Sequence, residues 1–98
     1  MKLTLNEPVR NFVVGENADI EISDVGSVML VANELLCITN EMNETHEIVC
    51  KEWGFYATAS IDKRLFKNGF LTALVTNKHS DEFIMLVSKS KLSFFQKY

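Results

Sequence analysis

Short apolar segments recur along this 98-residue chain and are separated by polar or glycine-containing breaks. In residues 18–23 (ADIEIS) apolar and polar residues alternate, and this two-residue period is typical of a half-buried strand. The longest uninterrupted apolar runs, residues 28–32 and 83–87, are far shorter than a membrane-spanning helix requires. We therefore expect a fold built mainly of strands, with no membrane span.

Strands are expected where β-branched and aromatic residues cluster, at residues 11–14, 18–23, 28–31, 35–39, 47–50, 55–58, 71–76 and 83–87. The polar stretch 40–46 predicts a hairpin, and the loop 77–82 predicts a second one. Residues 24–27 (DVGS) indicate a turn, and residues 1–9 a loosely held arm or an edge segment.

One helix is well marked, at residues 60–68. Ser60 is a good N-cap because its hydroxyl can accept a hydrogen bond from a free N–H of the first turn. Leu65 is expected to face the sheet, while Gly69 and Phe70 supply a left-handed stop and an apolar residue that folds back. A second, C-terminal helix is expected after Ser88 or Ser90.

This order of elements predicts a single α+β domain over residues 1–98 with a mainly antiparallel sheet. An OB-like small barrel, which also has three strands, a helix and two strands, is the alternative. The expected core consists of apolar residues from the strands and the helix: Ile20, Ile22, Met29, Ile38, Ile48, Phe55, Leu65, Leu74, Ile84 and Leu86.

The two cysteines, Cys37 and Cys50, lie in apolar segments and are expected to be buried thiols. A hairpin that turns at residues 43–44 would place them opposite each other, close enough for a disulfide, whereas a one-residue shift would separate them. The N-terminal residues contain no secretory signal, so we expect a cytoplasmic protein.

Charge is divided unevenly along the chain. Residues 1–50 hold two bases and nine acids, a net charge of −7, whereas residues 51–98 hold eight bases and four acids, a net charge of +4. The two halves could lie against each other, or the asymmetry could mark an interaction surface. The candidate partner surface combines helix bases with C-terminal aromatic residues: Lys63, Arg64, Lys67, Phe94, Phe95 and Tyr98. The same aromatic residues could instead close the core.

No motif in the sequence indicates chemistry. Cys37, His46, Cys50 and His79 lack the paired spacing of a zinc site, and the glycines are scattered singly, so no phosphate-binding loop is present. The adjacent residues 78–81 (KHSD) cannot converge on one reacting atom. We therefore expect no catalytic residue, metal or cofactor, and a function that depends on contact with a protein partner or a second copy of the chain.

The rival hypothesis is binding of single-stranded nucleic acid by an OB-like domain. Proteins of that kind combine a basic groove with aromatic side chains on which bases stack. The basic second half and its aromatic residues fit this pattern, whereas the overall charge of −3 opposes it.

Residues 53–61 (WGFYATASI), followed by Arg64-Leu65, Gly69-Phe70 and residues 72–75 (TALV), carry a resemblance. They resemble a group of short uncharacterised bacterial proteins with a W-G-F-Y-A-T-x-S-I segment, which tend to be encoded beside surface-polysaccharide biosynthesis genes. The likeness covers mainly residues 53–87, and Ala59 stands where we expect proline. The resemblance implies an accessory role in glycan assembly and identifies no catalytic or ligand-binding residue.

Overall fold

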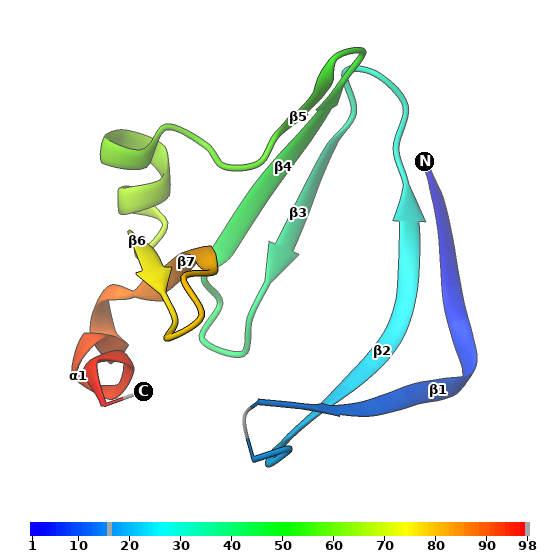
Figure 1. Cartoon of the computed structure of the whole chain (residues 1–98). Helices are drawn as coiled ribbons and strands as arrows, with labels where there is room; N and C mark the ends of the chain where they lie inside the picture. Colours follow the sequence, from blue (N-terminus) through cyan, green and yellow to red (C-terminus); the bar gives the residue numbers. More distant parts are fainter. Residues whose placement is uncertain (16, 98) are drawn as a thin grey trace.

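Strands dominate the fold. The structure is a computed structural model that describes residues 1–15 and 17–97. Three separate antiparallel ladders make up its sheets (Figure 1). They are β1 (Lys2–Val14) with β2 (Ile20–Met29); β3 (Leu35–Thr39), β4 (Thr45–Lys51) and β5 (Gly54–Tyr56); and β6 (Phe70–Thr76) with β7 (Glu82–Ser88). The helical segments are η1 (Ile61–Leu65), η2 (Lys89–Lys91) and α1 (Leu92–Gln96).

The broad expectation of an antiparallel α+β fold is confirmed, and the OB-like barrel is wrong. A barrel requires hydrogen-bonded strands all the way around, and in the described residues the three ladders do not pair with one another. The order of strands and helix along the chain matches that of an OB barrel, but this order does not determine which distant strands pair. None of the helices described here is long and apolar enough to cross a membrane.

The β1–β2 hairpin is longer than expected. Residues 24–27, expected as a turn, lie inside β2, and β1 takes in most of the segment expected as an arm or edge. Gly26 pairs with Leu5, and a Cβ atom at Gly26 would overlap the carbonyl oxygen of Thr4. Glycine is therefore needed here because the two backbones approach closely, and not because the chain turns.

An irregularity in β1 keeps the apolar side chains of this hairpin on one face. The register changes between the pairs Leu5↔Gly26 and Arg10↔Asp24, so four residues of β1 lie opposite one residue of β2. Three extra residues, an odd number, reverse the alternation of β1. Leu3 and Leu5 before the bulge therefore share a face with Phe12 after it.

The β3–β4 register differs from the one that would pair the cysteines. Cys37 lies opposite Glu47, Cys50 lies opposite Phe55, and both thiols are free. The loop closes earlier than expected because the Asn40 side-chain oxygen accepts hydrogen bonds from the N–H groups of Met42 and Glu44. Cys37 is exposed and Cys50 half-buried, so the expectation of two buried thiols is wrong for Cys37.

The helix predicted at residues 60–68 is present in a wider winding. Ser60 caps it as expected, since its Oγ accepts a hydrogen bond from the Arg64 N–H at 3.2 Å. The Leu65 N–H donates to the Ser60 carbonyl at 3.0 Å, five residues back, which gives η1 its π-helical turn. Gly69 ends the segment with φ +102°, and Phe70 is buried beyond it. The C-terminal helix is present as α1.

The expected core is mostly wrong. Leu65 is fully buried, but among the other nine residues Ile48 and Leu86 are half-buried and the rest are exposed: Ile20, Ile22, Met29, Ile38, Phe55, Leu74 and Ile84. The buried apolar residues of the described chain are Leu65, Phe70 and Val87. Alternation identifies which face of a strand is apolar, but it does not say whether the same chain covers that face.

The chain is also open in shape. Its radius of gyration is 15.4 Å, whereas a compact domain of this length has about 12.6 Å. Its accessible surface is 7954 Å², about 2,300 Å² more than a compact monomer of this mass exposes. The β1–β2 hairpin stands to one side of the three-stranded sheet, and η1, β6, β7 and α1 lie on the other (Figure 1).

Replacement of Leu65 by alanine tests the small core. Because Leu65 is fully buried, we expect Leu65→Ala to lower the free energy of unfolding by about 2–5 kcal/mol. The matched control is Leu74→Ala, which truncates a leucine that is 66% exposed. This control should change the free energy of unfolding by less than about 0.5 kcal/mol. Urea titrations of dilute protein measure both, and equal losses would contradict this description of the core.

Candidate interaction surface

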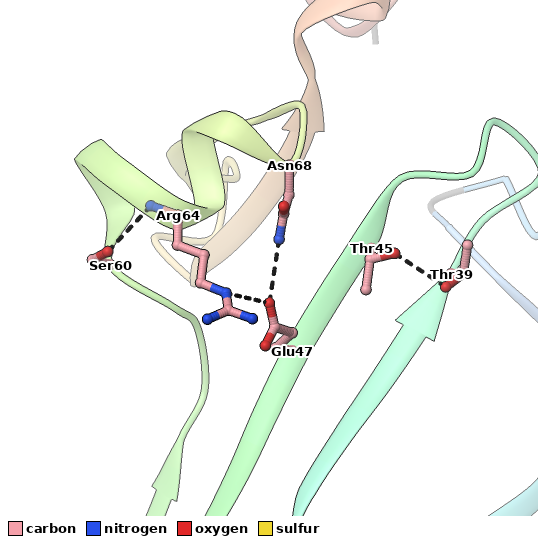
Figure 2. A network of polar contacts seen from close by, with 6 residues as sticks. All are labelled: Thr39, Thr45, Glu47, Ser60, Arg64 and Asn68. Carbon is pink, nitrogen blue, oxygen red and sulfur yellow. Dashed lines mark hydrogen bonds and ion pairs between the residues drawn. The ribbon is translucent and has the colours of Figure 1, made fainter.

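An ion pair holds η1 against the three-stranded sheet. Glu47 on β4 is only 8% exposed, and its Oε1 accepts a hydrogen bond from Arg64 Nε at 2.6 Å (Figure 2). The Asn68 amide donates a longer bond to the same oxygen at 3.4 Å. A buried carboxylate needs such partners, because its desolvation is otherwise uncompensated. The predicted partner residue Arg64 is therefore engaged within the chain.

A second polar contact joins the β3–β4 loop to the end of β7. Glu44 accepts hydrogen bonds from the Asn40 amide at 2.9 Å and from the Ser88 hydroxyl at 2.5 Å. These two donors, the Asn40 amide first, lower the pKa of the Glu44 carboxyl, because they bind its ionised form. Gly69 lies so close that a Cβ there would meet the Glu44 carboxylate at 2.7 Å.

The remaining predicted bases lie on the surface of the same unit. Lys63 and Lys67 on and after η1 are exposed. Nearby, Lys89 Nζ lies 3.7 Å from the centroid of the Phe66 ring, a close cation–π contact between η2 and the η1 segment. The η1 segment and the segment after β7 lie on the same side of the three-stranded sheet (Figure 1).

The C-terminal aromatic residues differ in their surroundings. Phe94 is 75% exposed, with Lys91 Nζ 5.6 Å from its ring centroid, whereas Phe95 is half-buried. Tyr98 lies outside the described residues. Both phenylalanines line an open hollow of about 340 Å³. We call its lining residues the C-terminal surface: Met85, Leu86, Val87, Ser88, Lys91, Phe94 and Phe95.

Another apolar surface lies on the β1–β2 hairpin, whose residues are not among the predicted partner residues. Cross-strand partners share a face, so the pairs Phe12↔Ile22 and Leu3↔Val28 lie on one side of the ribbon. We call this side the hairpin face: Leu3, Leu5, Phe12, Val14, Ile20, Ile22 and Val28. All except the half-buried Val14 are exposed. The opposite side is mostly polar and includes the pair Asn11↔Ser23. The alternation of Ile20 and Ile22 in the sequence indicates an apolar strand face, and the same pattern is typical of a face that packs into a core.

Charge differs between the tip of the hairpin and the C-terminal segment. Asp19 and Glu21 lie near the tip of the hairpin, and Arg10 on the hairpin face is neutralised by Asp24 at 3.1 Å. Beyond Glu82 the chain has three lysines and no acid. The acids of the first half are shared between the hairpin and the β3–β4 region, where Glu44 and Glu47 contact Ser88 and Arg64 of the second half.

The residues considered for a zinc site lie on different elements: Cys37 on β3, His46 and Cys50 on β4, and His79 in the β6–β7 loop. No group of three His, Cys, Asp or Glu side chains in the described part of the chain could hold a metal ion. In the β6–β7 loop, Asn77 Oδ1 accepts hydrogen bonds from the N–H groups of His79 and Asp81, and this organises the loop itself.

No protein-family model, curated protein or solved structure matches the chain.

The Glu47–Arg64 contact can be tested by truncation. Arg64→Ala leaves a buried carboxylate without its main partner, and we expect the free energy of unfolding to fall by about 1–3 kcal/mol. Lys63→Ala, an exposed neighbour, is the control and should change it by less than about 0.5 kcal/mol. Urea titrations compare the two variants, and an Arg64→Ala effect as small as the control would contradict the role assigned to the ion pair.

Acid should weaken the contact made by Glu44. Its pKa is lowered in the folded chain, so its stabilising contribution is present above the usual pKa of a glutamate and is lost as the pH falls through the folded value. We expect Glu44→Gln to make unfolding less dependent on pH between about pH 6 and pH 3. Glu41→Gln in the same loop is the control. Identical pH profiles of wild type and Glu44→Gln would refute the coupling.

Proposed function

We propose that this protein is a non-catalytic interaction subunit that works by binding other protein chains through its apolar surfaces. The observation that carries the proposal is the hairpin face, six exposed apolar side chains on one side of a two-stranded ribbon, divided into two groups by the Arg10–Asp24 ion pair. A two-stranded hairpin is at best marginally stable in water when nothing covers its apolar face. Large exposed apolar patches mark sites of association.

The open shape supports the same conclusion. A chain that exposes about 2,300 Å² beyond a compact monomer has enough surface to form a specific protein interface. An accessory role in bacterial surface-polysaccharide assembly, in the cytoplasm, would be one setting for such a subunit. That setting rests on the resemblance of residues 53–87.

A second candidate function is binding of single-stranded nucleic acid. Trp53 is 67% exposed and forms an edge-to-face pair with Tyr56, with ring centroids 5.2 Å apart, so it offers a surface on which a base could stack. The net charge of −3 opposes phosphate binding. Titration with mixed-sequence single strands, with Trp53 emission as the readout, tests this candidate. Salt-sensitive quenching that Lys63→Glu abolishes would favour it over protein binding.

Small-angle X-ray scattering tests the interaction proposal. At concentrations where the protein is monomeric, we expect a radius of gyration near 15.4 Å. We also expect strong fluorescence from a dye that binds exposed apolar surface, since the hairpin face is exposed. Ile22→Asp should reduce dye binding, whereas the control Ser23→Asp, on the polar side of the same strand, should not. A single chain that scatters as a compact domain of about 12.6 Å and binds no dye would contradict the proposal.

A further inference from the structure

We propose that the partner is a second copy of this chain, and that copies associate head to tail. The hairpin face of one copy would lie on the C-terminal surface of the next. This inference rests on the proposed function and names the partner, the two surfaces and the symmetry of their contact.

The area that each chain exposes fits two contacts. A standard interface buries about 800 Å² on each partner, and a subunit in a head-to-tail assembly uses one surface toward each of two neighbours. Two such contacts need about 1,600 Å², and permanent assemblies bury more. The excess of about 2,300 Å² over a compact monomer is more than a single standard contact uses, and it is sufficient for two contacts of standard size.

The shapes of the two surfaces differ in a complementary way. The hairpin face belongs to a projecting ribbon, whereas the C-terminal surface contains a hollow between β7 and α1. In the described residues β7 pairs only with β6, so its outer edge is open, and residues 85–88 of that strand line the hollow. An open strand edge beside apolar side chains is a common docking place for another strand.

Charge favours head-to-tail contact over two-fold contact. Glu21 pairs with Val13 on the polar side of the ribbon, so Asp19 at the tip is the acid next to the hairpin face. A two-fold contact that joins two hairpin tips would set Asp19 against its own copy, and like charges in an interface are unfavourable. Head-to-tail contact instead places Asp19 near Lys91, which lines the C-terminal surface of the next copy. Because the β1–β2 hairpin and the β7–α1 segment lie on opposite sides of the three-stranded sheet, one copy can contact two neighbours at once (Figure 1).

Mixing two interface variants tests the arrangement directly. Ile22→Asp breaks the hairpin face and Phe94→Asp breaks the C-terminal surface, so each variant alone should be a single chain of 11.2 kDa. A mixture still has one intact surface on each variant, and we expect a 1:1 dimer of twice that mass by native mass spectrometry. The controls Ser23→Asp and Ser93→Asp should assemble as wild type does.

Charge reversal provides a second arm that leaves both apolar surfaces intact. Asp19→Lys and Lys91→Glu should each weaken assembly at least tenfold at low salt, and the two changes in one chain should restore it. Failure of restoration, or a Phe94→Asp variant that still dimerises, would overturn the head-to-tail arrangement. A wild-type protein that stays monomeric at all concentrations, with the larger radius of gyration and with dye binding, would overturn self-association but leave the proposed function standing. A compact single chain would overturn both.

Discussion

Most of this structure depends on one constraint, namely that a two- or three-stranded ladder has two faces and needs something to cover the apolar one. Here the chain divides its strands among three small ladders that barely cover each other. The consequence is a buried apolar core of Leu65, Phe70 and Val87, and a set of apolar faces left toward solvent. A subunit of a larger assembly resolves this constraint by burying those faces against another chain.

Polar contacts, rather than a large apolar core, hold the C-terminal elements on the central sheet. Glu47 with Arg64, and Glu44 with Ser88, hold the helical and β6–β7 unit against the central sheet. These contacts depend on geometry, so they orient the C-terminal surface with respect to the sheet. The β1–β2 hairpin is joined to the central sheet at its base, where the N-terminal ammonium pairs with Glu34 at 3.1 Å, and its apolar face stays exposed.

Local structure was predictable where one or two residues determine it. Ser60 and Gly69 bracket η1 as their chemistry requires, and both hairpin loops expected after residues 39 and 76 are present. What depends on distant residues was not predictable from one sequence. The register of β3 on β4 is set by the Asn40 loop. The hairpin face was not predicted, because alternating apolar residues on a strand have the same pattern whether that face is exposed or buried. Of the predicted surface residues, Arg64 proved to be a partner of Glu47, a buried acid that nothing in the sequence distinguishes.

The central claim is that apolar strand faces are open in one chain and covered by another copy. Amide hydrogen exchange of β1–β2, followed as a function of protein concentration, tests it most directly. The account predicts that protection of these amides rises as concentration drives association, whereas protection around Leu65 stays unchanged. Protection of the hairpin that is strong and independent of concentration would contradict the account, because the face would then be covered within a single chain.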